Sequence, residues 1–211
     1  MISFCLLVGN FKSVGTKIQR NGSHVASFID PHAFDFLETD MRPFPLLTLL
    51  EEILANREKT LVFSQYVETL DCLEKIIKSE LGEQPLIYHG GLSQSVRSEI
   101  INRFQNESAA RILLISLRAG GLGLNLTSAS RVIHYDLWYN PAVENQATDR
   151  AFRIGQKRNV FVHRFITKNS FEEKIDAMIT SKRELADMTI TSGESWIARM
   201  SHEELKELFE R

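Results

Sequence analysis

Apolar residues along this chain alternate between short continuous runs and longer stretches with a helical period. The short runs predict five strands, at residues 60–64, 85–88, 111–116, 131–135 and 159–167. Between them, helical spacing and capping residues predict helices at 46–54, 66–80, 93–104, 141–152 and 170–188. Strands that are apolar throughout and alternate with helices are typical of a parallel sheet covered on both faces. We therefore expect an α/β fold in three layers with a mainly parallel sheet.

The first part of the chain does not follow this alternation. Glycines, asparagines and Pro31 interrupt any period within residues 1–44, which we expect to form an irregular lead-in, open to interpretation as the remnant of a preceding region. The α/β domain is expected to occupy residues 45–190. Ser201 opens a capping box, so residues 191–211 are expected to form a tail with a short helix that packs on this domain.

Composition excludes several classes of protein. The chain has 211 residues, of which 43% are hydrophobic and 25% are charged, so it can bury a sizeable core and is not a disordered chain. Two cysteines cannot form a disulfide framework or a four-cysteine zinc site. The six histidines do not have metal-ligand spacing, and no apolar run is long enough to span a membrane. We expect an intracellular protein with no metal site and no membrane association.

Charge is unevenly distributed along the chain. The formal net charge is −2, but residues 97–164 hold 10 basic and 5 acidic side chains, a local net charge of +5. A positive field of this kind attracts phosphate groups. Ordinary variation along a solvated surface is the alternative explanation.

The loops that follow the predicted strands are the expected place for ligands, because parallel sheets bind them beyond the carboxyl ends of their strands. One of these loops, residues 116–126, has three glycines within four residues, together with Ser116 and Arg118. Glycine lets backbone N–H groups come close to an anion. The loop therefore suits a phosphate, although a turn that merely needs glycine has the same composition.

Two arginines and a strand-end carboxylate are further candidates. Arg150 and Arg153 are three residues apart, so on a helix they project from one face, and a phosphate between them would relieve their repulsion. Ion pairs with Asp149 and Glu144 would also relieve it. Asp136, at the end of a predicted strand, is interpreted as an acceptor that orients its neighbours.

Four motifs in one order carry a resemblance to a known family. They are Lys59–Tyr66, Tyr88–Gly91, Leu114–Leu126 and Gln146–Gln156. Together they resemble the Swi/Snf-type ATPases, which are double-stranded-DNA translocases of helicase superfamily two, and most closely their compact bacterial and archaeal members. The motor of that family is a pair of RecA-like lobes, and residues 45–211 resemble the second, C-terminal lobe.

The resemblance implies roles for matching residues. Arg150 and Arg153 would be catalytic arginine fingers that reach the γ-phosphate of ATP bound to lobe one. The nucleotide cleft would include Gly121, Gly123, Asn125, Gln146 and Asp149. Contacts with the DNA phosphate backbone would come from Ser64, Gln65, Gly90, Ser116 and Arg118, and Trp138 and Tyr139 would either stack on DNA or anchor their loop. Phe152 stands where many members have histidine, which suggests packing instead of a polar role.

What the chain lacks limits the activity expected of it. It has no G-x-x-x-x-G-K-[ST] loop and no Asp-Glu-x-His motif, the parts that hold ATP phosphates and Mg²⁺ on lobe one of this family. We expect ATP and Mg²⁺ to act only in a complete two-lobe motor, with double-stranded DNA and an N-terminal ATPase lobe as partners. The alternative is an orphan lobe that binds DNA or protein without catalysis. The resemblance implies a nucleoid-associated location in a prokaryote and a nuclear one in a eukaryote.

Overall fold

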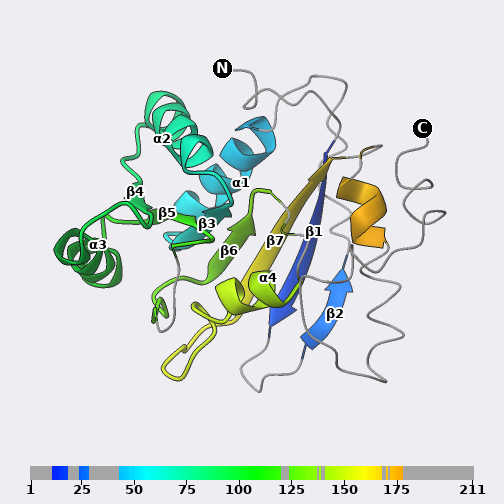
Figure 1. Cartoon of the computed structure of the whole chain (residues 1–211). Helices are drawn as coiled ribbons and strands as arrows, with labels where there is room; N and C mark the ends of the chain where they lie inside the picture. The colour runs from blue at the N-terminus through cyan, green and yellow to red at the C-terminus, as the bar shows by residue number, and fades with distance from the viewer. Residues whose placement is uncertain are drawn as a thin grey trace.

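A computed structural model describes residues 11–18, 24–28, 43–119, 124–136, 138, 141–167, 170 and 172–177 of the chain. These residues form a seven-stranded sheet with the order β2-β1-β7-β6-β3-β5-β4 (Figure 1). The strands are β1 (Phe11–Ile18), β2 (His24–Phe28), β3 (Thr60–Ser64), β4 (Leu86–Tyr88), β5 (Ile112–Ser116), β6 (Arg131–His134) and β7 (Val160–Thr167). The helices are α1 (Pro43–Ala55), α2 (Val67–Leu81), α3 (Gln94–Asn106) and α4 (Pro141–Thr148).

Five neighbouring strands form the parallel part of the sheet, as the apolar runs predicted. β3 lies between β5 and β6 and pairs in parallel with both, while β4 and β7 extend the sheet on either side. All five residues of β3 and all five of β5 are buried. Continuous apolar runs are the expected pattern for strands that are covered on both faces.

The lead-in predicted to be irregular instead contains two strands. β1 pairs antiparallel with β7 over eight residues, from Phe11 opposite Thr167 to Ile18 opposite Val160, and β2 pairs antiparallel with β1. β1 has a glycine at its centre and no clear alternation, so local pattern does not reveal it. Its hydrogen-bonding partner is a strand near the other end of the chain, and pairing covers an edge of β7 that would otherwise be open.

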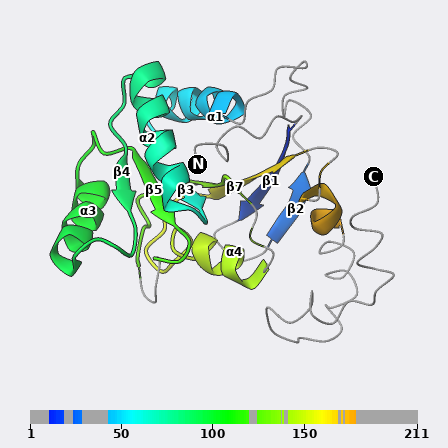
Figure 2. The same ribbon diagram turned by 45° about the horizontal axis from the view of Figure 1, so that its top comes forward.

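Helices cover both faces of the parallel sheet, which makes the three predicted layers (Figure 2). On one face, Val62, Leu114 and Ile133 pack against Leu50 of α1 and Leu73 of α2. On the other face, strand residues pack against α3 and α4, among them Leu61, Phe63, Leu113, Ile115 and Val132 with Phe104 and Ala147. Successive residues of one strand thus serve opposite cores.

The start of α3 and the end of α2 lie at capping residues, whereas α4 ends earlier than predicted. Ser93 Oγ accepts a hydrogen bond from the backbone nitrogen of Val96 and begins α3. Gly82 has a φ of 65°, the left-handed conformation that ends α2. α4 ends at Thr148, earlier than predicted, because the chain then tightens into hydrogen bonds such as that from Ala151 N to Thr148 O.

The C-terminal part is described only as far as residue 177. Ser170 Oγ accepts a hydrogen bond from Glu172 N at 3.1 Å, and residues 172–177 are helical, in agreement with the helix predicted to begin at residue 170. The rest of that helix and the tail over 191–211 lie outside the described residues. None of the described helices is both long and apolar enough to cross a membrane.

Candidate nucleic-acid and phosphate interface

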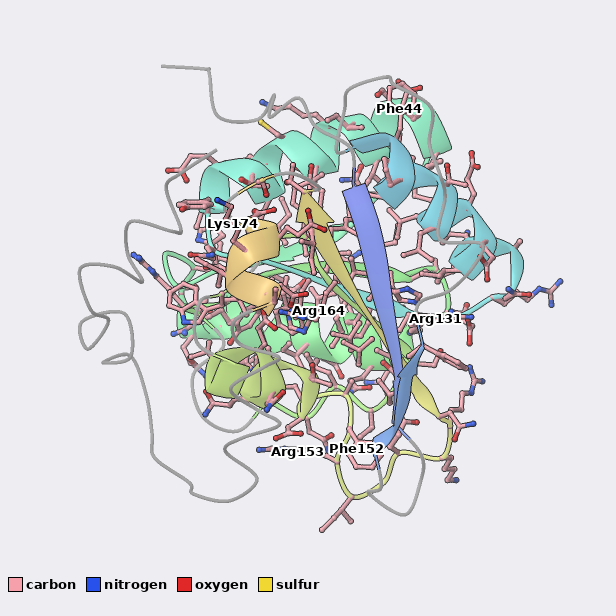
Figure 3. The ribbon with its side chains drawn as sticks, turned by 90° about the vertical axis from the view of Figure 1, so that its right-hand side faces the viewer. Phe44, Arg131, Phe152, Arg153, Arg164 and Lys174 are labelled. Atoms are coloured by element: carbon pink, nitrogen blue, oxygen red, sulfur yellow. The ribbon has the colours of Figure 1, made fainter. Side chains whose placement is uncertain are left out.

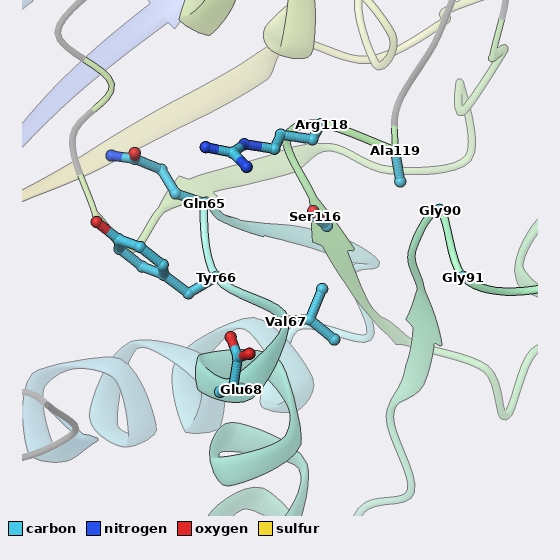
Figure 4. Close-up of a pocket in the computed structure, with 9 residues that line it drawn as sticks. All are labelled: Gln65, Tyr66, Val67, Glu68, Gly90, Gly91, Ser116, Arg118 and Ala119. Carbon is cyan, nitrogen blue, oxygen red and sulfur yellow. The ribbon is translucent and has the colours of Figure 1, made fainter. Parts of the chain in front are cut away.

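A pocket of about 450 Å³ lies at the carboxyl ends of three neighbouring strands (Figure 4). Gln65 follows β3, Gly90 follows β4, and Ser116 and Arg118 are at and after the end of β5. Four of the predicted DNA-binding residues are therefore brought together from separate parts of the sequence. Their meeting results from the topology, because β4, β5 and β3 are adjacent and parallel.

The pocket offers several donors to an anion. The guanidinium of Arg118 is exposed and extends across the pocket towards Gln65 and Tyr66 (Figure 4). Ser116 is a buried residue at the pocket wall. A Cβ atom built at Gly90 would meet only Ala119 Cβ within 4 Å, at an ordinary contact distance of 3.9 Å, so this side of the pocket is open around the glycine.

The N-terminus of α2 also faces this pocket. Tyr66 is its N-cap residue and makes no side-chain capping hydrogen bond, so no side chain at the cap competes for the first N–H groups of this helix. Glu68, in the first turn, lines the pocket too, and its carboxylate would repel a phosphate placed beside it. Figure 4 places Glu68 at the other end of the pocket from Arg118, so the favourable position for an anion is near Arg118 and Gly90.

Asp136 holds the loop that carries Gln65. One carboxylate oxygen accepts a hydrogen bond from Ser64 Oγ, and the other accepts one from Gln65 N at 2.9 Å. Ser64 is fully buried, and its Oγ also accepts a hydrogen bond from Tyr66 N. Asp136 is thus an orienting acceptor, as predicted, and Ser64 positions the loop while its own side chain stays out of the pocket.

Arg150 lies inside the lobe instead of on its surface. It is 6% exposed, and its Nη1 atom is buried with no hydrogen-bond partner among the described residues. The guanidinium carbon is 5.8 Å from the centre of the Phe63 ring. Burial lowers the pKa of Arg150, Tyr88 opposes that shift, and Arg153 adds to it; the arginine stays charged at neutral pH.

Arg153 is exposed, and Figure 3 places it beside Phe152 below α4. Phe152 is partly buried against the core, which agrees with the packing role suggested for it. Gln146 and Asp149 are exposed residues at the end of α4. The proposed ion pair of Glu144 with these arginines does not form, because the Glu144 carboxylate is engaged elsewhere.

Glu144 instead pairs with Arg164 of β7. The Arg164 Nε atom is 2.9 Å from Glu144, and its Nη1 atom is 2.6 Å from Asp176 in the helical segment 172–177. Burial alone would lower the pKa of Arg164, but the two carboxylates raise it overall. This ion-pair group links α4 to the sheet, and α4 leads directly into the segment that carries Arg150.

The other predicted residues occupy different places. Trp138 is half-buried against the core, and its backbone nitrogen donates a hydrogen bond to Glu144, which favours the loop-anchoring alternative. Asn125 is exposed, and its backbone carbonyl accepts a hydrogen bond from the side-chain amide of Gln105. Gly121, Gly123 and Tyr139 lie outside the described residues.

Sequence reasoning missed two aromatic residues of this region. Tyr66 is 57% exposed at the pocket, and Phe63 supports Arg150. An aromatic residue directly after Gln65 in a strand-end loop was a usable signal for Tyr66. Phe63 gave none, because it looks like any other apolar residue of a buried strand. Within the described residues, no group of three or more His, Cys, Asp or Glu side chains could hold a metal ion.

Comparison with known proteins agrees with this architecture. Residues 45–155 match the model of the helicase conserved C-terminal domain. The helicase/translocase candidate YwqA of Bacillus subtilis is 48% identical over 164 residues, which are 78% of this chain and 18% of that protein. The chain therefore spans about a fifth of the length of such curated relatives.

Solved structures give the same assignment. The C-terminal domain of the Sulfolobus solfataricus SWI2/SNF2 ATPase matches with a TM-score of 0.63 and 38% identity, over 80% of this chain and 68% of that one. The core of the same ATPase in complex with double-stranded DNA matches with a TM-score of 0.67 and 40% identity, over 80% of this chain and 35% of that one. This chain belongs to the helicase conserved C-terminal domain family and is a RecA-like lobe of the Swi2/Snf2 type.

Proposed function

We propose that this chain is the second motor lobe of an ATP-dependent double-stranded-DNA translocase. In this proposal it contributes contacts with the DNA backbone and two arginines that act on ATP, and it needs an ATP-binding lobe for hydrolysis. The observation that carries the proposal is the convergence of Gln65, Gly90, Ser116 and Arg118 in one pocket.

The chemistry of the pocket supports a phosphate ligand of DNA. Arg118 supplies a charge, and Gly90 leaves room for a close approach. These groups recognise a phosphate backbone without reading bases, as a motor that moves along any sequence requires. The likeness to an ATPase core solved with double-stranded DNA supports the same ligand.

The environment of Arg150 supports a role towards ATP phosphates. The Nη1 atom of the buried Arg150 guanidinium has no hydrogen-bond partner among the described residues, and phosphate oxygens are a ligand that would satisfy it. Arg153 is exposed three residues later, where a group on another lobe can reach it. In the proposed motor, these two residues stabilise the charge that develops on the transferred phosphoryl group.

The DNA proposal is tested with this chain alone. Fluorescence anisotropy with a labelled duplex, at several salt concentrations, should give an affinity that falls steeply with salt. Arg118→Gln should weaken binding on every sequence and lower the salt slope by about 1. Arg103→Gln is the matched control, since Arg103 is an exposed arginine on α3 paired with Glu107. Equal affinity of wild type and Arg118→Gln would contradict the proposed interface.

The ATP proposal needs a lobe one, supplied separately from a Swi2/Snf2-type relative. DNA-stimulated ATP hydrolysis is expected only in the mixture and should fall by about 10³–10⁵ in Arg150→Ala, the range assigned to arginine fingers. The duplex affinity of that variant should stay near wild type. Hydrolysis by this chain alone, or full activity of the mixture with Arg150→Ala, would contradict the proposed division of labour.

A further inference from the structure

A tight turn at residues 153–156 presents one apolar side chain to solvent. Gln156 N donates a hydrogen bond to Arg153 O at 2.9 Å, which closes the turn between α4 and β7. Gly155 has a φ of 106°, the left-handed conformation that glycine adopts without strain. Ile154, at the second position of the turn, is 100% exposed.

The side chain of Gln156 fixes this turn to the body of the lobe. Its Nε2 atom donates to Ala129 O at 2.8 Å and to Ala151 O at 3.1 Å, and its Oε1 atom accepts from Arg158 N at 2.9 Å. Three hydrogen bonds from one half-buried side chain therefore hold three backbone segments together. An exposed apolar residue alone is common, but this one is held in place before any partner arrives.

Three basic residues lie within four positions of Ile154 in the sequence. Arg153, Lys157 and Arg158 are exposed, none of them forms an ion pair with a described residue, and residues 151–171 contain no Asp or Glu. An apolar tip with a basic surround is complementary to an apolar depression bordered by carboxylates. A protein surface offers such a depression, whereas a phosphate backbone attracts the cations but leaves an isoleucine in water.

The turn lies at the opposite edge of the sheet from the DNA pocket. It precedes β7, and Gln156 reaches Ala129, just before β6, so it belongs to the amino ends of the parallel strands. The pocket is at their carboxyl ends. Contacts of a duplex with the pocket therefore do not explain why Ile154 is presented here.

We infer that the turn 153–156 is a docking element for the ATP-binding lobe of the motor, with Ile154 as an apolar anchor in a carboxylate-rimmed depression of that lobe. The inference rests on the proposed function, because Arg153, the first residue of the turn, is the exposed arginine assigned to the nucleotide. Docking of Ile154 places Arg153 against the same lobe. Gln156 is the positioning residue of the turn.

The test measures binding between this chain and a separately produced ATP-binding lobe of a Swi2/Snf2-type relative, by isothermal titration calorimetry. Ile154→Ser should weaken this binding by about tenfold or more, the effect of losing one well-packed anchor. Val96→Ser is the control, because Val96 is a 40% exposed apolar residue on α3, and it should change the affinity less than twofold. Gln156→Leu should weaken binding although it keeps Ile154.

The outcomes separate this inference from the proposed function. Ile154→Ser and Val96→Ser should both keep the melting temperature and the duplex affinity of the wild type. Equal lobe affinity of wild type and Ile154→Ser, or no lobe binding by the wild type, overturns the docking role. Loss of duplex affinity in Ile154→Ser with unchanged lobe affinity also overturns it and assigns the turn to DNA. Failure of the wild type to bind duplex, with lobe binding intact, contradicts the DNA proposal and leaves the docking role standing.

Discussion

The guanidinium of Arg150 lies over the ring of Phe63, with its central carbon 5.8 Å from the ring centre. Phe63 directly precedes Ser64 and Gln65, so the ring that supports this arginine belongs to the strand that ends at the pocket. His134 stacks on Phe63 as well, with a centroid distance of 5.6 Å and an interplanar angle of 19°. One aromatic residue therefore connects the strand end at the pocket with the residue proposed to act on ATP.

Replacing Phe63 should affect turnover beyond its effect on stability. Phe63→Leu removes the cation–π contact, worth about 1 kcal/mol, and should lower kcat of the two-lobe mixture by up to about tenfold with little change in KM for ATP. Phe104→Leu is the matched control, because Phe104, on α3, is equally buried and its ring lies under the Lys59 ammonium group. If both variants lose the same turnover after correction for the folded fraction, Phe63 has only a packing role.

Acid should destabilise the lobe through His134. Burial, together with the nearby charge of Arg164, lowers its pKa to about 3, whereas the unfolded chain titrates near the ordinary value of about 6.5. Below pH 6.5 the unfolded state therefore binds the extra proton, and this residue alone should lower the unfolding free energy by about 1.4 kcal/mol per pH unit until about pH 3.

Urea denaturation from pH 7.5 to pH 4.5 measures this effect. His134→Gln keeps a polar group for Thr148, whose hydroxyl is 3.1 Å from the histidine Nε2 atom, but it cannot titrate. The slope of unfolding free energy against pH should be smaller in the variant than in the wild type. Identical slopes would show that His134 has the same protonation in the folded and the unfolded state, and would contradict the lowered pKa.

Asp136→Asn should weaken binding of duplex DNA at the pocket, although Asp136 does not line the pocket. Ser64 Oγ and Gln65 N donate to different oxygens of the carboxylate, and in asparagine one of these oxygens is replaced by an NH₂ group, which is a donor, so the amide cannot accept at both positions. We expect a loss of about 1–3 kcal/mol in stability and a several-fold loss in duplex affinity. A double-mutant cycle with Ser64→Ala, measured by denaturation, should give a coupling energy of about 0.5–3 kcal/mol. Additive effects would mean that the two side chains act independently.

Arg164→Met should destabilise the lobe by about 3–5 kcal/mol, because Glu144 and Asp176 would remain as buried carboxylates without their cation. Adding Glu144→Gln and Asp176→Asn to this variant should recover part of the loss. Arg103→Ala, which breaks an exposed pair with Glu107, should cost no more than about 0.5 kcal/mol. Thermal and urea unfolding of the wild type and these three variants measures the differences in stability. An equal loss of stability in Arg164→Met and Arg103→Ala would refute the buried ion-pair argument.

Much of the fold was predictable because its strands are central. β3 and β5 are covered on both faces, so every residue of each is buried and each appears in the sequence as a continuous apolar run. β1 was not predictable, because its strand conformation depends on the backbone of β7, almost 150 residues later in the chain. Local periodicity contains no information on such a partner.

For the candidate site, the sequence predicted the residues better than their orientations. Gln65, Gly90, Ser116 and Arg118 were expected at strand ends, and the parallel order of β3, β5 and β4 brings them together. Ser64 was expected to face DNA but is buried against Asp136. A residue type at a strand end does not reveal which neighbour will accept its hydrogen bond.

By itself, the sequence determined the alternation of strands and helices, the loops that end at the pocket, and the motif that contains Arg150 and Arg153. These features depend on local apolar periodicity and on residue types within short segments. Only the tertiary structure decided that Arg150 is buried over Phe63 and that Glu144 pairs with Arg164 and not with Arg150 or Arg153. It also decided that Gln156 fixes the turn in which Ile154 is exposed to solvent. Each of these contacts joins segments that become neighbours only when the sheet assembles, because strand order and register determine which side chains can meet.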